Sequence, residues 1–423
     1  MTTVDLDVRG ITPESSEPEE QPDPLDKLSR LVPFIETHEF NYTQYLQEPE
    51  EERVLIGTNT PLYIAKYDEE TEKIKYRAYH YPEPQPINSC GNKQHQKLLP
   101  KKHIESEKTS DENEDIVYPQ ILVVVDHSIY KKYGGNVFKI AQIVAAYWNS
   151  VDLLYRTIKS PKIRLNIAGL IIPESPEAIP YVEKNYNHDL GSIDTSKMEN
   201  DMVNYFAENS EHLDGIPEDS FDVAFLMTNR LNAPNFLGTA VGDVTYTTVS
   251  WGTGDFEHNS DSVNTGAHEL AHLLKADHDW EKGCLRSPNI MGNPEGKSAF
   301  AWSQCSLRDM IEFVNKPENQ FLRNRPNIGK PHPRILQGRY STRDHQCQSL
   351  GGKLQNYFNL DPTYFSHVPR EYEQDCSVLF CASRNAETDY EAEEKETKQP
   401  PLDGTSCGCG KICFQGKCVD DQE

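Results

Sequence analysis

Three histidines and one glutamate fall within the twelve residues HELAHLLKADHD, which run from His268 to Asp279. His268 and His272 are four positions apart, so on a helix their imidazoles project from one face and can bind a single ion. Glu269 lies one position further round, where a carboxylate can exchange a proton with a group beside that ion. The pattern HExxH is short, however, and by itself it also fits a surface helix whose histidines bind no metal.

His278 makes a zinc site the better interpretation. It lies six residues after His272, too far round a straight helix to join the pair, so the helix must end and the chain must turn sharply. Three neutral imidazoles are a known ligand set of catalytic zinc, which keeps its fourth position for water. Bound zinc lowers the pKa of that water to about 7. We expect Glu269 to be the general base that takes the proton.

Met291 follows in the segment SPNIMGN, twelve residues after Asp279. Alone, a buried methionine is more often a filler of the hydrophobic core. The order of helix, turn, third histidine and Asn-Ile-Met-Gly resembles the metzincin metalloproteases, in which a methionine lies in a tight turn beneath three histidines. The resemblance implies that His268, His272 and His278 bind one catalytic Zn2+ and that Met291 forms this turn.

Residues 117–325 resemble the reprolysin (adamalysin) class of metzincins, which includes snake-venom metalloproteases and the ADAM and ADAMTS proteases. Asp279 directly follows the third histidine, and four segments are similar to the family: YPQILVVVDHSIYKKYGGN, DVAFLMT, LGTAVGDVTY and WSQCSLRDMIEFV. The resemblance implies a zinc endopeptidase and a disulfide bond between Cys284 and Cys305. It also implies a structural Ca2+, for which the sequence does not identify ligands.

Residues 340–418 resemble the cysteine-rich module of ADAMTS proteins through YSTRDHQCQSLGG, CSVLFC and PLDGTSCGCGKICFQGKCV. The resemblance leaves Cys409 as an extra cysteine, which is either free or bridged to another chain. The layout is most similar to the venom metalloproteinases of parasitoid wasps and to arthropod salivary enzymes, which implies a secreted, toxin-like protein. The cysteines that match the module are Cys347, Cys376, Cys381, Cys407, Cys413 and Cys418.

Cys90 lies in the segment INSCGN, which resembles the cysteine switch of the family's prodomains. A thiolate in the fourth position of zinc excludes water, so the resemblance implies an inactive zymogen. The alternatives are a structural thiol and a disulfide bond with Cys409. The segment KLLPKK is a dibasic candidate for processing, and no furin-type RxKR sequence follows Cys90.

Lys275 departs from the family pattern, which has glycine at this position. The chain needs a positive φ to leave the helix and bring in His278, and a residue other than glycine costs on the order of 1 kcal/mol there. Zinc ligation in structural sites is worth about 10 kcal/mol or more. We therefore expect the turn to hold. The alternative is a displaced third ligand and weaker zinc binding.

The composition limits the class of protein. The chain has 423 residues and a net charge of −25, and such an acidic protein repels nucleic acid and anionic membrane surfaces. Its apolar runs are too short for a membrane span, and the N-terminal residues lack the apolar core of a signal peptide. Seven of the ten cysteines lie after residue 340, and such a cluster indicates either a disulfide framework or a metal cluster. If the cysteines form disulfides, the protein is extracellular. We expect a monomer that acts on protein substrates.

Strands that alternate with long helices are predicted to position the histidines. The main helix has an apolar side chain at every third or fourth position, which is typical of a helix that covers a sheet. The predicted strands are 118–126, 162–172, 221–229 and the Gly-broken, Thr-rich edge strand 237–249, and the predicted helices are 136–159, 196–213 and 305–316.

These patterns predict an α/β domain with long helices, and the resemblance implies a metzincin domain with a twisted mixed sheet and the zinc helix in the cleft. A β-rich prodomain precedes it, and a small disulfide-rich α+β module follows it. The function that follows is a zinc endopeptidase made as a latent zymogen; the alternative is a catalytically silent homologue that binds a host protein through its cysteine-rich module. The predicted parts are a disordered acidic segment 1–28, a prodomain with linker 29–116, the protease domain 117–325 and the cysteine-rich module 326–423.

Overall fold

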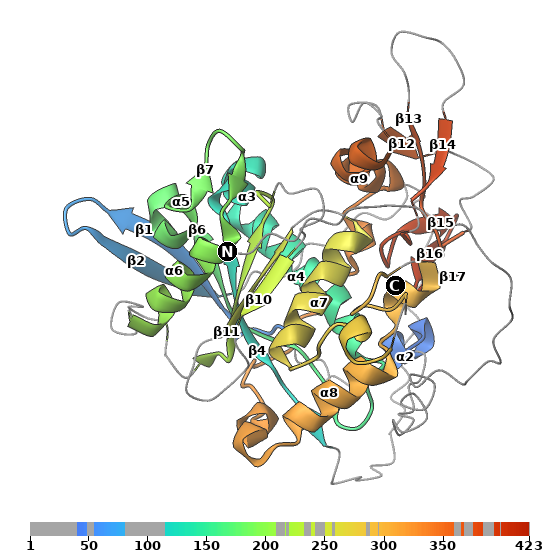
Figure 1. Cartoon of the computed structure of the whole chain (residues 1–423), viewed down its shortest axis with the longest axis horizontal. Helices are drawn as coiled ribbons and strands as arrows, with labels where there is room; N and C mark the ends of the chain where they lie inside the picture. The colour runs from blue at the N-terminus through green and yellow to red at the C-terminus, as the bar shows by residue number, and fades with distance from the viewer. Residues whose placement is uncertain are drawn as a thin grey trace, which may run out of the picture. The chain divides into compact units, whose positions relative to one another are not determined.

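The computed structural model of the chain is shown in Figure 1. The segment predicted to be disordered, 1–28, and Cys90 both lie outside the residues that it describes. All described residues belong to one compact unit. They are residues 40–48, 55–80, 115–208, 216, 220–231, 238–241, 250–255, 259–284, 288–294, 296–358, 365–367, 375–383, 393–397 and 399–422.

A seven-stranded mixed sheet has the strand order β10-β11-β9-β4-β6-β1-β2. Neighbouring strands from β11 to β1 are parallel, whereas the edge strands β10 and β2 are antiparallel to their neighbours. The mixed sheet predicted from the sequence is therefore confirmed. Its strands are β1 Pro61–Asp68, β2 Lys73–His80, β4 Gln120–Val125, β6 Asn166–Pro173, β9 Val223–Thr228, β10 Gly238–Val241 and β11 Ser250–Asp255.

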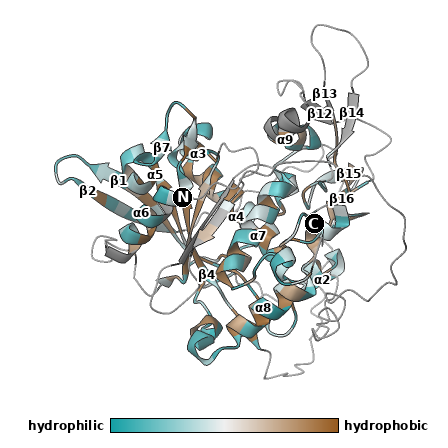
Figure 2. Cartoon of the chain, viewed as in Figure 1, coloured by the Kyte–Doolittle hydropathy of each residue, from teal (hydrophilic) through white to brown (hydrophobic). Residues whose placement is uncertain are grey.

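Strand β4 shows why the apolar runs form the centre of this sheet. Five of its six side chains are buried, because helices cover both faces of a central parallel strand. Val123 packs in a cluster with helices α4 (Val137–Tyr155) and α7 (Ser260–Leu273), and Val124 packs in a second cluster with α6 (Thr195–Glu208). Figure 2 shows strong apolar colour along the central strands of the sheet, whereas the hairpin β1–β2 at its edge is more polar.

Two tyrosine hydroxyls of α4 hold α7, the helix with the first two histidines. Tyr147 donates a hydrogen bond to the carbonyl oxygen of Ser262 at 2.9 Å, and Tyr155 donates to that of Ala267 at 2.7 Å. Gly266 lies at the same contact, where a Cβ atom would come within 2.3 Å of the Tyr147 hydroxyl. The glycine therefore allows the two helices to approach this closely.

The hairpin β1–β2 corrects one expectation. We expected the tyrosine-rich strands before residue 85 to form a β-rich domain of their own, but β1 pairs in parallel with β6, with Leu62 opposite Leu170. The segment is β-rich, as predicted, and it extends the central sheet instead of forming a separate one. An alternating pattern indicates a strand but does not identify its partner, because pairing is decided by tertiary contacts.

The cysteine-rich module combines helix α9 with two small sheets, so the predicted disulfide-rich module is confirmed. Three disulfide bonds hold it, and Cys409 is exposed and free. The bonded pairs are Cys347–Cys381, Cys376–Cys413 and Cys407–Cys418. The elements are α9 Arg343–Phe358, β12 Phe365–His367, β13 Phe380–Ser383, β14 Glu393–Glu396, β15 Ser406–Gly408, β16 Lys411–Phe414 and β17 Lys417–Asp420.

Shorter elements connect these parts. None of the helices in the described part of the chain is both long and apolar enough to cross a membrane. The connecting elements are α2 Tyr42–Gln47, β3 Ile116–Val117, α3 His127–Lys132, β5 Lys162–Ile163, α5 Pro180–Glu183, β7 Tyr186–Asn187, β8 Ser192–Ile193 and α8 Gln304–Val314.

The α4–α7 contact gives the first prediction. Gly266→Ala should destabilise the protein by about 1 kcal/mol or more, because overpacking outweighs the gain of about 1 kcal/mol in helix propensity. Tyr147→Phe removes the clashing hydroxyl and its hydrogen bond, at a cost of about 1 kcal/mol. The double variant should be less destabilised than the sum of the single variants. Urea unfolding of all four proteins measures this, and additive effects would show that the hydroxyl does not set the contact.

Candidate metal centre

The turn after helix α7 brings His278 back toward the helix. Lys275 has a φ of 73°, in the left-handed region that favours glycine. The amide of Ala276 donates to the carbonyl oxygen of Ala271 at 2.9 Å, and the amide of Lys275 donates to that of His272 at 2.9 Å. These are the two hydrogen bonds of a Schellman motif, a common way to end a helix. The turn that the family builds with glycine is therefore present with lysine.

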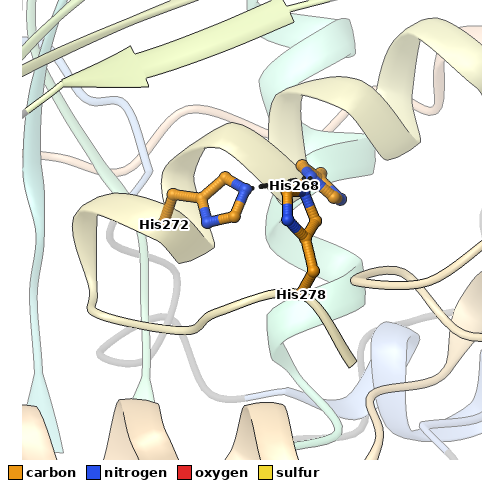
Figure 3. A group of neighbouring side chains, drawn as sticks. All are labelled: His268, His272 and His278. Atoms are coloured by element: carbon orange, nitrogen blue, oxygen red, sulfur yellow. Dashed lines mark hydrogen bonds between the residues drawn. The ribbon is translucent and has the colours of Figure 1, made fainter. Parts of the chain in front are cut away.

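Figure 3 shows three imidazoles that point toward one another, two from α7 and one from the loop that follows it. The Nε2 atom of His268 lies 3.1 Å from Nε2 of His272 and 3.3 Å from Nε2 of His278. Two nitrogens at about 2.0–2.1 Å from a tetrahedral zinc ion are about 3.3–3.4 Å apart. The spacing of the ligand atoms therefore fits a single bound ion.

Backbone carbonyl groups fix the tautomer of two of these histidines. The Nδ1 atom of His268 lies 2.8 Å from the carbonyl oxygen of Ile290, and Nδ1 of His272 lies 2.8 Å from that of Ala276. A carbonyl oxygen only accepts, so each Nδ1 carries the proton and each Nε2 presents a lone pair to the centre. Facing lone pairs repel each other unless a cation lies between them. Such carbonyl partners are typical of histidines that bind metals.

Burial keeps the imidazoles in the form that binds metal. It lowers the pKa of His268 to about 4, with repulsion from His272 as a second cause. Burial is also the main reason that the pKa of His272 is lowered. Both rings are therefore neutral near pH 7, so a metal ion does not have to displace protons from them.

Met291 lies in the segment that supports the histidines from below. Its side chain is fully buried, and its carbonyl oxygen accepts a hydrogen bond from the amide of Asp279 at 3.1 Å. The preceding residue, Ile290, provides the carbonyl partner of His268. Two consecutive residues of this turn therefore contact the metal-binding loop and the metal-binding helix.

Asp279 joins the loop after His278 to the start of helix α8. Its carboxylate is buried and accepts hydrogen bonds from the hydroxyls of Ser303 and Ser306, the latter at 2.9 Å. The same two segments are linked by a disulfide bond between Cys284 and Cys305, the pair that the family resemblance implies. The segment from Asp279 to Cys284 is therefore attached to the start of α8 at both of its ends.

Glu269 lies on α7 between the two helical histidines, and the residue is 6% exposed. The antiparallel edge strand β10 contacts the same helix. The rest of the predicted edge strand, residue 237 and residues 242–249, lies outside the described residues. The helix with the candidate base is thus next to an edge at which a further strand can add.

Two residues that the sequence reading missed contact His278. The indole of Trp280 stacks on the imidazole, with ring centroids 4.2 Å apart and an angle of 10° between the planes. The Oε1 atom of Glu281 lies 3.6 Å from Nδ1 of His278, where a carboxylate can orient a metal ligand. Both residues lie in the short 3-10 helix Asp279–Glu281, directly after His278. Their position next to the third histidine in the sequence is the signal that could have identified them.

A second group of possible ligand side chains is already bonded. Among the described residues it consists of Cys376, Cys407 and Cys418. Each of these sulfurs is in a disulfide bond, so the group does not offer a metal site. Among the described residues, the histidine group is therefore the candidate metal centre.

Comparison with protein families agrees with this geometry. Residues 119–308 match the model described as metallo-peptidase family M12, and this range includes all three histidines. Residues 119–308 form a reprolysin-like M12 metallopeptidase domain that contains the three histidines. Residues 337–419 of this metallopeptidase match the ADAMTS cysteine-rich domain 2. Its catalytic and cysteine-rich parts thus follow each other in the order that the sequence predicts.

Curated relatives are similar to this chain at modest identity. A Bombyx mori protein named "A disintegrin and metalloproteinase with thrombospondin motifs like" is 29% identical over 346 residues, or 73% of this chain and 45% of the relative. Venom metalloproteinase 3 of Eulophus pennicornis is 26% identical over 206 residues, covering 46% and 49% of the two chains. Human "A disintegrin and metalloproteinase with thrombospondin motifs 8" is 26% identical over 72% of this chain and 34% of its own. The chain spans about half or less of the length of these relatives.

Lys275 gives the prediction for this site. Lys275→Gly should raise the free energy of unfolding by up to about 1 kcal/mol, because glycine adopts the positive φ without steric strain. Lys275→Ala is the matched control, since it removes the same side chain and keeps the strain. Thermal unfolding of the zinc-loaded proteins checks the difference. Equal midpoints for the glycine and alanine variants would show that strain at this turn is negligible.

Proposed function

We propose that the chain is a zinc-dependent endopeptidase that hydrolyses peptide bonds in protein substrates. The observation that carries the proposal is the convergence of three Nε2 atoms, 3.1 and 3.3 Å apart, at the end of α7. The match of the surrounding residues to metallo-peptidase family M12 supports it. His268, His272 and His278 would hold one Zn2+.

The chain's own residues supply the rest of the chemistry. When zinc is bound, it supplies Lewis acidity, which lowers the pKa of water to about 7 and polarises the scissile carbonyl group. Glu269 takes up the proton of the attacking water and transfers it to the leaving amine. Its buried position keeps that proton within the site. Ile290 and Ala276 orient two ligands through their carbonyl oxygens throughout the cycle.

Strand β10 would bind the substrate. It forms an antiparallel edge of the sheet beside α7, so an extended peptide can add to its outer side as a further strand. Main-chain hydrogen bonds then hold the peptide in register while side chains decide specificity. This arrangement would place the scissile bond alongside the histidines and Glu269.

The protein would act outside the cell. Four disulfide bonds in the described residues support an oxidising compartment, where such bonds persist. A role as a venom or salivary toxin is the finer proposal, supported by similarity to venom metalloproteinases 2 and 3 of Eulophus pennicornis. The proposed division is an N-terminal segment 29–116, whose strands extend the protease sheet, a protease domain 117–325 and a cysteine-rich module 326–423. The two family matches lie inside the latter two.

Glu269→Gln tests the proposed chemistry. It should abolish peptide hydrolysis while one zinc per chain stays bound, because the amide cannot accept the proton and the ligands are unchanged. Glu312→Gln, at an exposed position on α8, removes the same charge and should leave turnover unchanged. Peptidase assays with zinc content by mass spectrometry measure both. A folded, processed, zinc-loaded wild-type chain without hydrolysis would favour the alternative of a catalytically silent homologue.

Cys90→Ala tests latency. If the Cys90 thiolate occupies the fourth zinc position, the substitution should raise the basal peptidase activity of the unprocessed chain. Cys409→Ala is the matched control, because it removes a free, exposed thiol of the described chain and should have no effect. Unchanged activity of the Cys90 variant, or a Cys90–Cys409 disulfide found by peptide mapping, would rule out the switch.

A further inference from the structure

The segment before the protease domain is built into the fold at four places. We propose that residues 40–80 are a permanent, noncovalently held part of the catalytic unit. Cleavage between residues 81 and 114 would then give a two-chain protein and would not release a propeptide. This inference concerns assembly and does not depend on the proposed peptidase activity.

Glu48 lies at the centre of a buried charge cluster. Its carboxylate accepts a hydrogen bond from Arg156 at the end of α4 and lies 3.6 Å from Nε of Arg164 and 2.5 Å from Nη1 of Arg334. All four side chains are at most 6% exposed. Asp152, 2.7 Å from Nε of Arg156, is a second carboxylate of the cluster among the described residues. Loss of Glu48 would remove a buried carboxylate from three buried guanidinium groups, which is strongly unfavourable.

Strand β1 occupies an inner position of the sheet. Leu62 and Ala65 are fully buried, and they belong to the core clusters on opposite faces of the sheet. The ring of Tyr63 lies so close to Gly169 of β6 that a Cβ atom there would be 2.8 Å from it. Release of β1 would expose the backbone edge of β6 and both apolar faces beside it, and such edges are prone to aggregation.

The chain between α2 and β1 is bound through its backbone. The carbonyl oxygen of Leu55 accepts a hydrogen bond from the amide of Ile167 at 2.7 Å, and that of Ile56 accepts from the amide of His332 at 2.9 Å. Ile167 belongs to the central sheet, and His332 belongs to the connector that leads to the cysteine-rich module. This short segment therefore joins the two parts of the protein.

Helix α2 lies between the protease domain and the cysteine-rich module. The rings of Tyr42 and Tyr45 are 5.2 and 5.4 Å from the ring of Phe414 on β16. Phe414 is 2% exposed, and Leu153 of α4 belongs to the same apolar cluster. Without α2 this cluster would lose the aromatic side chains that cover it, so the helix also helps to hold the module in place.

The contacts are those of a domain interior, with buried charge, an inserted strand and an aromatic core. Processing at the linker would then cut the connection that carries Cys90 and leave residues 40–80 bound. The partner that fits this surface is the chain's own N-terminal fragment.

Cleavage of the folded full-length chain tests the proposal. A recognition sequence for a site-specific protease replaces residues 98–104, and the purified protein is cut and passed over a size-exclusion column at physiological and at high salt. The two fragments should elute together, with a 1:1 mass by native mass spectrometry, and should separate only in denaturant. Release of the N-terminal fragment under native conditions would overturn the proposal, whether or not the remainder stays soluble.

Glu48→Gln tests the buried cluster within the cut protein. The fragment should dissociate at least about tenfold faster than in the wild type, because a buried charge pair mainly slows dissociation. Glu70→Gln, at an exposed position after β1, is the matched control and should match the wild type. Equal rates for all three proteins would show that the cluster does not hold the fragment. The wild-type cleavage decides the proposal even if the Glu48 variant does not fold.

Discussion

The close approach of three Nε2 atoms is the constraint on which the rest of the site depends. Two of the imidazoles share a helical face, but the third reaches them only because α7 ends in a Schellman motif with Lys275 at a φ of 73°. The same motif places the carbonyl oxygen of Ala276 against His272 and so orients the second ligand. This one turn therefore reverses the chain direction and also orients His272 as a metal ligand. Both roles explain why the strained backbone of Lys275 is tolerated there.

The surrounding structure keeps that turn in place. The Ile290–Met291 turn contacts both His268 and the backbone of Asp279, and the serines of α8 together with a disulfide bond hold the loop from the other side. Helix α7 is in turn held by the tyrosines of α4, which packs on the central sheet. The N-terminal segment extends that sheet and neutralises the charge at the end of α4. The site is thus supported by contacts that reach the chain's first described residues.

Local signals predicted most of the site and part of the fold. Histidine spacing identified the metal-binding face, and apolar runs located β4, β6, β9 and α4, because buried strands and amphipathic helices leave patterns within a few residues. Strand β11 was missed, since Gly252 and Gly254 break its pattern and pairing with β9 decides its structure. The partner of β1 and the arginines around Glu48 lie about a hundred residues or more away, where sequence patterns carry no information on contacts.

A crystal structure of the purified chain with anomalous data at the zinc absorption edge tests the central claim most directly. The account predicts one anomalous peak at about 2.0–2.1 Å from Nε2 of His268, His272 and His278. A peak coordinated by only two of these histidines, with His278 turned away, would contradict the role given to the Lys275 turn. If the protein contains one zinc per chain but no anomalous peak lies at the three histidines, the account as a whole is contradicted.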